Sequence, residues 1–332
     1  MTSGKPVQIS GIGCYVPERV LTNEDLEKMV DTTNDWILQR TGIEKRHLVE
    51  KGKATSDLAE QAVRALSKNT GLDLNEIELM IVATVTPDMF FPSTACLLQH
   101  KLGIEQTWGF DLSAACCGFV YALSVGASFV ASGTHSKVVV VGADTMSSII
   151  DYQDRATCVL FGDGAGAVLL EPAQDPRNAV LDFYHELDGS GGPALQMPAG
   201  GSLLPANCET VKNRLHFVKQ EGQTVFKFAI RKMEEVSRHI LAKNSFVPND
   251  LKLLIPHQAN ARIINGTAER LGLKQQQYVL NLNKYGNTTA ATIPLAIQDA
   301  LRSGRLSKGD LVLLASVGAG FTVGASLLRW AY

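Results

Sequence analysis

The sequence predicts an α/β fold built from two similar halves, residues 1–174 and residues 175–332. Three observations support this prediction. Short apolar runs alternate with helical stretches, the apolar runs fall into two series, and the two series carry matching sequence in the same order. Such alternation is typical of sheets whose parallel strands are joined by crossover helices. A repeated order of weakly similar segments indicates duplication of one architecture.

Each series contains four apolar runs that we expect to be strands. The first series is Leu79–Val85, Thr107–Leu112, Val138–Gly142 and Ala165–Leu170, and the second is Leu251–Ile255, Tyr278–Leu282, Leu311–Ser316 and Val323–Leu328. Helical patterns fill the intervals, for example at Cys117–Ser132 and Ile293–Arg302. Val7–Val16 reads as a further strand ahead of the first series.

The two series match in register as well as in order. Asn75–Ile81 resembles Asn249–Ile255, and each of these runs is followed by a loop and a helix that ends in Leu-Gly, at Leu102-Gly103 and Leu271-Gly272. Cys116 precedes Gly133 by the same number of residues as Asn287 precedes Gly304, and His257 follows the strand that matches Leu79–Val82. These three side chains are therefore expected at strand-to-helix junctions, where α/β sheets favour ligand sites.

Composition excludes several classes of function. The 332 residues are 45% hydrophobic, which suits a large core, and the net charge of -2 argues against a nucleic-acid partner. The six cysteines form no C-x-x-C pair and no H-E-x-x-H occurs, so we expect no metal. Because Val7–Val16 reads as a strand and not as a signal peptide, we expect a cytoplasmic protein with reduced thiols.

Two uncharged or glycine-rich segments have more than one interpretation. Leu311–Leu328 carries no charge and could be read as a membrane span, but its glycines and hydroxyl side chains favour two buried strands joined by a turn, so we expect no membrane partner. The run Gly162–Gly166 lacks the G-x-G-x-x-G spacing and the dinucleotide context. We therefore predict close strand packing there, and no cofactor.

Cys116 lies where a predicted strand ends and a predicted helix begins, within Phe110–Leu123. A helix N-terminus offers free N–H groups and partial positive charge, and both favour the thiolate that acts as the nucleophile. The same N–H groups can bind a tetrahedral oxyanion. The alternative is a buried structural cysteine, which is the commoner fate of cysteine in general.

Two further motifs carry polar side chains at such junctions. His257 lies in Ile255–Ile263 and Asn287 lies in Asn281–Pro294. A single histidine after an apolar run is more often a satisfied core residue, and the asparagine segment could be a turn with a helix cap. Neither motif decides a function by itself.

Taken together, the segments resemble the thiolase-fold condensing enzymes along essentially the whole chain. The resemblance rests on Thr33–Ile43, Phe91–Ala95, Asp154-Arg155, Phe161–Ala167, Phe226–Phe228, Pro256–Asn260 and Gly286–Ala290. The set Cys116, His257 and Asn287 is similar to that of β-ketoacyl-acyl-carrier-protein synthase III, whereas elongating synthases use Cys-His-His and thiolases use a second cysteine. The resemblance implies a duplicated, thiolase-like fold with a five-layer αβαβα core, and a homodimer.

The resemblance also implies a reaction. Cys116 would take the acyl group of a short acyl-CoA, and malonyl-acyl-carrier-protein would then lose carbon dioxide to give an enolate that His257 and Asn287 stabilise. Condensation would yield a β-ketoacyl-carrier protein and initiate type II fatty acid synthesis, with CoA thioester as substrate and no cofactor. The backbone N–H groups of Cys116 and Ala319 would form the oxyanion hole.

Binding residues follow from the same resemblance, one by one. Those expected to contact CoA are Thr32, Trp36, Arg40, Arg155 and Asn260. Those expected to bind the acidic carrier protein are Lys227, Arg231, Arg262 and Lys274, although each could be an ordinary surface charge. The acyl pocket is expected to contain Met146, Val317 and Phe91 of the partner subunit. Cys117, Val317 and Ala319 depart from the commonest family pattern, which leaves the acyl preference open.

Two other functions remain open at this point. A related enzyme of secondary metabolism could transfer its acyl group to a small acceptor, and turnover with malonyl-carrier protein would distinguish it. A non-catalytic module of the same fold could serve as a scaffold, and absence of acylation by acetyl-CoA would reveal it. The length and branching of the primer are not determined by the sequence.

Overall fold

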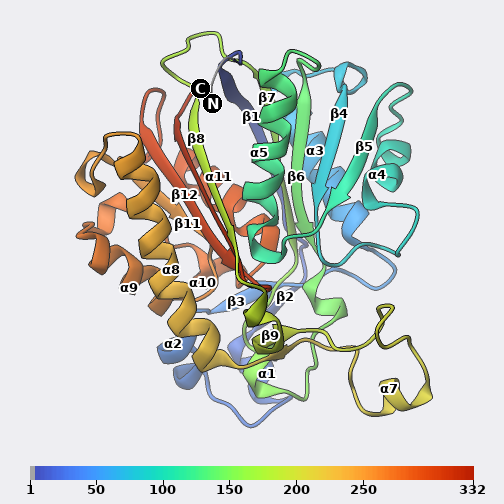
Figure 1. Cartoon of the computed structure of the whole chain (residues 1–332). Helices are drawn as coiled ribbons and strands as arrows, with labels where there is room; N and C mark the ends of the chain where they lie inside the picture. Colours follow the sequence, from blue (N-terminus) through green and yellow to red (C-terminus); the bar gives the residue numbers. More distant parts are fainter. Residues whose placement is uncertain (1–3) are drawn as a thin grey trace.

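Two mixed β-sheets form the centre of the protein, as seen in a computed structural model that describes residues 4–332 (Figure 1). The first sheet has the strand order β1-β7-β6-β4-β5 and the second has the order β11-β12-β13-β8. The strands of the first sheet are β1 (Val7–Tyr15), β4 (Leu79–Ala83), β5 (Trp108–Leu112), β6 (Val138–Asp144) and β7 (Gly164–Pro172). Those of the second are β8 (Val180–Leu187), β11 (Leu253–Pro256), β12 (Leu311–Gly318) and β13 (Thr322–Arg329).

Helices cover both sheets and fill the space between them. α3 (Thr55–Thr70) and α4 (Thr94–Leu102) lie outside the first sheet, and α8 (Gly222–Lys243) and α9 (Ala261–Leu271) lie outside the second. α5 (Gly118–Ala131) and α11 (Thr292–Arg302) lie between the sheets, which explains why α5 has no charged residue. The expected five-layer αβαβα core is confirmed.

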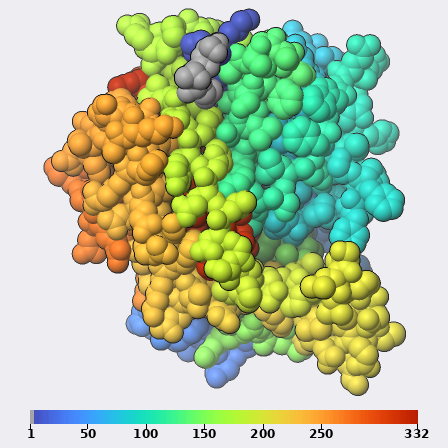
Figure 2. All heavy atoms as spheres, viewed as in Figure 1, coloured from blue at the N-terminus to red at the C-terminus, as the bar shows by residue number. Residues whose placement is uncertain are grey.

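Shorter helices and strands connect these elements. The short helices and strands are α1 (Asn23–Glu27), α2 (Asn34–Thr41), α6 (Arg155–Cys158), α7 (Cys208–Lys212), α10 (Leu282–Tyr285), β2 (Val20–Thr22), β3 (Lys45–His47), β9 (Leu195–Gln196) and β10 (Lys219–Gln220). The 3₁₀ helices are η1 (Leu74–Glu76), η2 (Ala115–Cys117), η3 (Met146–Ser148), η4 (Gly189–Ala194), η5 (Pro248–Asp250), η6 (Gln275–Gln277) and η7 (Thr289–Ala291). On the surface, the β8 segment fills the seam between α5 and α8, and the segment around α7 projects from the body (Figure 2).

The pairing of strands is repeated in the two sheets. β4 runs parallel to β6 as β11 runs parallel to β12, and β6 pairs antiparallel with β7 as β12 pairs with β13. The predicted crossover pattern therefore applies to the parallel pairs, while β7 and β13 add antiparallel pairs. Residues 319–321 are all that joins β12 to β13, and so short a connection permits only an antiparallel pair. The division into residues 1–174 and 175–332 remains our proposal for the two halves.

The predicted strand at Tyr278–Leu282 is wrong, because only Tyr278 pairs with its neighbour, Leu254. The side-chain amide of Gln258 takes the place of a ladder here. Its nitrogen donates to the carbonyl of Val279 at 3.1 Å, and its oxygen accepts from the N–H of Asn281 at 2.9 Å. The second sheet consequently lacks a counterpart of the edge strand β5.

Other expectations from the sequence are confirmed. Leu311–Leu328 forms two buried strands, and within residues 4–332 we find no helix with the length and apolarity that a membrane crossing requires. Gly103 and Gly272 end their helices in the left-handed region, at φ 72° and 71°. A Cβ on Gly166 would lie 2.5 Å from Cβ of Pro294, so the glycine run does allow close packing.

Arg46 is a fully buried cation that joins the N-terminal segment around Asn23 to the segment around Val159. It is 0% exposed, its Nη1 donates to Oδ1 of Asn23 at 2.8 Å, and its Nη2 donates to the carbonyl of Val159 at 2.7 Å. Within residues 4–332 no carboxylate forms an ion pair with it, and burial lowers its pKa to about 10. Arg46 therefore stabilises the fold through hydrogen bonds to neutral acceptors.

We predict that Arg46→Met lowers the free energy of unfolding by about 3 kcal/mol, because two buried acceptors lose a charged donor. Urea denaturation followed by circular dichroism measures this loss. Arg177→Met is the matched control, since the Arg177 side chain is 87% exposed and its ion pair with Asp175 should contribute nothing measurable. Equal stability of the two variants would show that Arg46 does not hold these segments together.

Candidate active site

Cys116 lies in η2, between β5 and α5, and both halves of the chain fix its backbone. Ser316 Oγ donates to the carbonyl of Cys116 at 2.8 Å, and Thr322 Oγ1 donates to the carbonyl of Ala114 at 3.0 Å. A Cβ on Gly318 would lie 2.8 Å from the nitrogen of Cys116, so the end of β12 packs directly against this N–H group. The cysteine side chain is 7% exposed.

Cys117 points in a different direction from Cys116. It is 0% exposed, and its Sγ donates to the carbonyl of Thr322 at 3.3 Å. Burial raises the pKa of the Cys117 thiol to about 11. Cys117 thus serves as a small buried side chain, while Cys116 faces a cavity described below.

His257 follows β11 and is held at both its backbone and its ring. Its N–H donates to the carbonyl of Ala315 at 2.8 Å, and its Nδ1 lies 2.7 Å from Thr292 Oγ1 at the start of α11. The residue is 2% exposed, and burial lowers the pKa of its imidazole to about 3. The ring is consequently neutral at physiological pH.

Asn287 is clamped by a short parallel bridge to the segment before β7. Its N–H donates to the carbonyl of Leu160 at 2.9 Å, and its carbonyl accepts from the N–H of Gly162 at 3.1 Å. Its Oδ1 accepts from the N–H of Thr289 at 2.9 Å. The side-chain oxygen is therefore engaged, and Nδ2 is left as a donor toward the cavity.

The structure corrects the alignment of Cys116 with Asn287 in the two halves. Ala115 and Thr289 begin η2 and η7 with φ of 47° and 49°, an unusual conformation for residues other than glycine. This shared feature aligns Cys116 with Ala290 and places Asn287 earlier in its loop. Positions at equal spacing before Gly133 and Gly304 are not equivalent, because the helices that precede these glycines differ in length: α5 has 14 residues and α11 has 11.

Cys116, His257 and Asn287 line one cavity, which we call the central cavity. It adjoins an outer cavity of about 580 Å³ that shares Phe226 and Asn260 with it. It also adjoins an inner cavity of about 190 Å³ that shares Cys116 with it. The lining of the inner cavity is mostly apolar and comprises Val85, Ala115, Cys116, Met146, Ile149, Phe161, Leu195, Gln196, Met197, Val218, Thr289 and Ala319. The thiol thus lies between a wide entrance and a small apolar chamber.

Most of the predicted CoA contacts surround the outer cavity. Trp36, Arg40 and Asn260 line it, and the guanidinium carbon of Arg155 lies 4.8 Å from the centre of the Trp36 ring. Asn260 already caps α9 through Arg262 N–H and donates to the carbonyl of Arg40 at 2.9 Å. Thr32 is not among the lining residues, and within residues 4–332 its buried hydroxyl has no hydrogen-bond partner.

The predicted acyl-pocket residues are divided among different places. Met146 lines the inner cavity, whereas Val317 lines the central one. Phe91 lines neither of these two cavities and is 84% exposed. Ala319 lines the inner cavity together with Cys116, one residue beyond the glycine that packs on the Cys116 N–H group.

Comparison with known proteins agrees with this geometry. Residues 110–189 match the family described as 3-Oxoacyl-[acyl-carrier-protein (ACP)] synthase III, and residues 241–330 match its C-terminal part. The chain is 57% identical, over the full length of both proteins, to Beta-ketoacyl-[acyl-carrier-protein] synthase III of Koribacter versatilis. The chain belongs to the β-ketoacyl-acyl-carrier-protein synthase III family. It is therefore an acyl-transferring condensing enzyme with the thiolase fold.

Solved structures extend the comparison within and beyond fatty acid synthesis. The 3-oxoacyl-[acyl-carrier-protein] synthase III from Aquifex aeolicus is 42% identical with a TM-score of 0.90, covering 98% of this chain and 100% of its own. The priming β-ketosynthase from the R1128 polyketide biosynthetic pathway is 32% identical with a TM-score of 0.91, covering 100% of this chain and 98% of its own. The chain thus shares one architecture with a synthase III and with a priming β-ketosynthase of a polyketide pathway.

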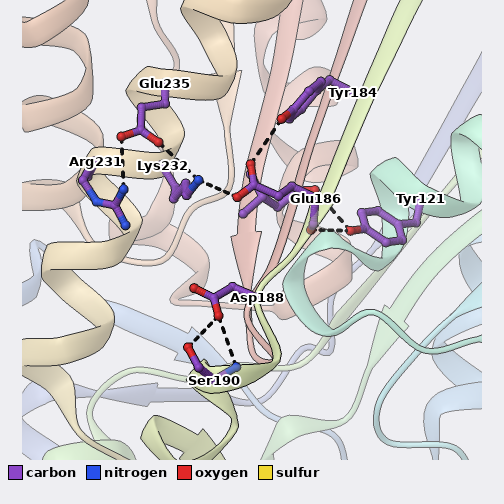
Figure 3. A network of polar contacts seen from close by, with 9 residues as sticks. Tyr121, Tyr184, Glu186, Asp188, Ser190, Arg231, Lys232 and Glu235 are labelled. Atoms are coloured by element: carbon purple, nitrogen blue, oxygen red, sulfur yellow. Dashed lines mark hydrogen bonds and ion pairs between the residues drawn. The ribbon is translucent and has the colours of Figure 1, made fainter.

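The charges on α8 divide into paired and unpaired groups. Lys232 and Arg231 bind Glu186 and Glu235, and the Tyr121 hydroxyl, from α5, donates to the carbonyl of Glu186 at 2.9 Å (Figure 3). Lys227 and Arg262 line the outer cavity, and within residues 4–332 neither forms an ion pair. Lys274 follows Gly272, which ends α9, whereas Arg262 lies in the first turn of that helix. Of the predicted carrier-protein residues, Lys227 and Arg262 are thus the two that line the outer cavity.

Burial acts against the preference for the Cys116 thiolate that the helix N-terminus is expected to provide. Burial raises the pKa of the Cys116 thiol, and the neighbouring Cys117 and Asp144 raise it further. His257 is neutral and so supplies no positive charge to oppose this. Burial thus favours the neutral form of both groups, the thiol of Cys116 and the imidazole of His257.

Sequence reasoning assigned no role to three residues that shape the site. Asp144 is fully buried at the end of β6 and binds Thr289 and the N–H of Ala290. Thr292 contacts the His257 ring, and Phe226 lines both the central and the outer cavities. Asp144 follows an apolar run as Cys116 and His257 do, so the same reasoning about strand ends could have identified it.

We predict that the rate of Cys116 alkylation by iodoacetamide rises about tenfold per pH unit between about pH 6 and pH 9. A raised pKa means that the thiolate is a minor species below it, and its fraction grows with every unit of pH. Mass-resolved labelling kinetics measure the rate, with Cys117→Ala as the control that should follow the same profile. A plateau near pH 7 would contradict the raised pKa.

Proposed function

We propose that this chain condenses a short acyl-CoA with malonyl-acyl-carrier-protein, giving a β-ketoacyl-carrier protein, CoA and carbon dioxide, and so initiates fatty acid synthesis. One observation carries the proposal. Cys116, His257 and Asn287 line a single cavity that lies between a wide outer cavity and a small apolar one. This arrangement suits a long thioester arm on one side of the thiol and an acyl chain on the other.

In the first half-reaction the Cys116 sulfur attacks the thioester carbonyl of the acyl-CoA. The carbonyl electrons move to oxygen, then return as the bond to CoA sulfur breaks, and the proton of Cys116 leaves with CoA. The N–H groups of Cys116 and Ala319 are the donors for the oxyanion. Contact between Gly318 and the Cys116 nitrogen supports this assignment, because it brings residue 319 to the same place.

In the second half-reaction malonyl-carrier protein occupies the position that CoA leaves. Its carboxylate departs as carbon dioxide, and the bonding electrons form an enolate whose oxygen accepts hydrogen bonds from His257 and Asn287 Nδ2. The enolate carbon then attacks the acyl carbonyl, and the Cys116 thiolate leaves. Neutral His257 is compatible with this role, since a neutral imidazole keeps one N–H that can donate a hydrogen bond.

The outer cavity is the proposed entrance for both thioesters. The adenine of CoA would bind between Trp36 and Arg155, which are now in contact at 4.8 Å and would have to separate by a further ~3 Å to admit a ring. Thr32, Arg40 and Asn260 complete the proposed nucleotide and pantetheine contacts. Lys227 and Arg262 are the better-supported carrier-protein contacts, because they line this entrance without competing ion pairs.

A homodimer in the cytoplasm completes the proposal. The edge strand β5 has no pairing partner on its outer side within residues 4–332, and Phe90 and Phe91 are each 84% exposed. Exposed edge strands and large apolar side chains are typical of surfaces that another chain covers. In the dimer, Phe91 would close the inner cavity of the partner subunit and, with Met146, set the acceptable acyl length.

A role in secondary metabolism is the second candidate, favoured by the likeness to the R1128 priming synthase. The higher identity to the Koribacter enzyme, 57% against 32%, supports the lipid role. Turnover with malonyl-carrier protein and with small free acceptors distinguishes the two. A non-catalytic scaffold would turn over neither acceptor, and its mass would stay unchanged after incubation with acetyl-CoA.

We predict that His257→Ala and Asn287→Ala still become acylated by acetyl-CoA but release carbon dioxide from malonyl-carrier protein at least about a hundredfold more slowly. The physical reason is that both donors serve the enolate, which forms after acylation. Intact mass measures the acyl-enzyme and labelled carbon dioxide measures decarboxylation, with the exposed His100→Ala as control. Normal decarboxylation in either variant would remove that residue from the mechanism.

A further inference from the structure

The hydroxyl of Thr292 lies against the His257 ring at the base of the central cavity. Its Oγ1 is 2.7 Å from Nδ1 of His257 and 3.0 Å from the carbonyl of Thr289. Thr292 is 2% exposed, at the first turn of α11. Within residues 4–332 this is the one hydrogen bond that the structure gives the ring of His257.

A threonine hydroxyl has one proton, so it can donate to only one of these two neighbours. The carbonyl of Thr289 already accepts the backbone N–H of Thr292, which closes η7. Nδ1 of His257 has Thr292 Oγ1 alone. The Thr289 carbonyl does not depend on this hydroxyl, so Thr292 Oγ1 can donate to Nδ1 instead, and the donor role proposed for His257 requires that it does so.

The direction of this hydrogen bond decides which ring nitrogen carries the proton. In a neutral imidazole one nitrogen is the donor and the other is the acceptor. If Nδ1 accepts from Thr292, the proton must be on Nε2, the nitrogen at the other side of the ring. With the proton on Nδ1 instead, Nε2 would present a lone pair, which repels an anionic oxygen.

We propose that Thr292 is a positioning residue that fixes His257 in the Nε2–H tautomer and thereby makes its ring a hydrogen-bond donor to the enolate oxygen. The proposal rests on the assignment of His257 to the enolate in the proposed function. Acylation of Cys116 precedes the enolate and does not require this donor. Thr292 should therefore matter for decarboxylation and much less for acyl transfer from CoA.

Thr288 provides a matched control in the same loop. It is 0% exposed, and within residues 4–332 its hydroxyl has no hydrogen-bond partner. Thr288→Val and Thr292→Val make the same chemical change at buried sites four residues apart. Thr292→Ser keeps the hydroxyl and should preserve the tautomer.

The first test is nitrogen NMR of the full-length protein labelled with ¹⁵N-histidine, since the chemical shifts of the two ring nitrogens report the tautomer directly. The chain has 7 histidines, and loss of a signal in His257→Ala assigns the ring. We expect the proton on Nε2 in the wild-type protein, in Thr292→Ser and in Thr288→Val, and a mixture of tautomers in Thr292→Val. A proton on Nδ1 in the wild-type protein would overturn the proposal without any variant having to fold.

The second test separates the two half-reactions. We expect Thr292→Val to lower kcat for malonyl-carrier-protein decarboxylation by about tenfold or more with little change in KM, and to leave the rate of acylation by acetyl-CoA within about twofold. Thr292→Ser should restore decarboxylation. Unchanged decarboxylation in Thr292→Val, or equal losses in both half-reactions, would overturn the proposal. A wrong assignment of His257 to the enolate would give a different result from a wrong role for Thr292, because His257→Ala would then decarboxylate malonyl-carrier protein normally.

Discussion

The carboxylate of Asp144 is the contact on which the geometry of the site depends. It is fully buried at the end of β6 and binds both halves of the chain at once. Burial raises its pKa, while the hydrogen bonds that it accepts act in the opposite direction. Its donors are Thr84 Oγ1 at 3.0 Å, Val85 N–H at 2.8 Å, Thr86 Oγ1 at 2.9 Å, Ala290 N–H at 3.2 Å and the Thr289 hydroxyl.

From this one contact the arrangement of the loops follows. The loop after β4 and the loop before α11 are bound to the same carboxylate, so η7 keeps a fixed position against the first sheet. Thr289 thereby holds its left-handed conformation, its N–H orients the Asn287 amide, and its carbonyl faces Thr292. The residues that surround the thiol are thus set by buried polar contacts between the two halves of the chain.

More of the sheets than of the site could be predicted from the sequence. Strands such as Val138–Gly142 and Leu311–Ser316 were predictable because continuous apolar runs mark buried strands. Tyr278–Leu282 was not, because a side-chain amide from Gln258, distant in sequence, replaces the ladder. The place of His257 at a strand end was predictable, whereas its neutrality and its contact with Thr292 depend on burial and on long-range packing.

The central claim is that Cys116, and not the adjacent Cys117, carries the acyl group. Intact-protein mass after incubation with acetyl-CoA, followed by peptide mapping of the acylated cysteine, tests it most directly. Because Cys116 lines the cavities and Cys117 is fully buried against Thr322, we expect one acetyl group per chain on Cys116, none in Cys116→Ala and normal acetylation in Cys117→Ala. An acetyl group on Cys117, with Cys116→Ala still acylated, would contradict the account.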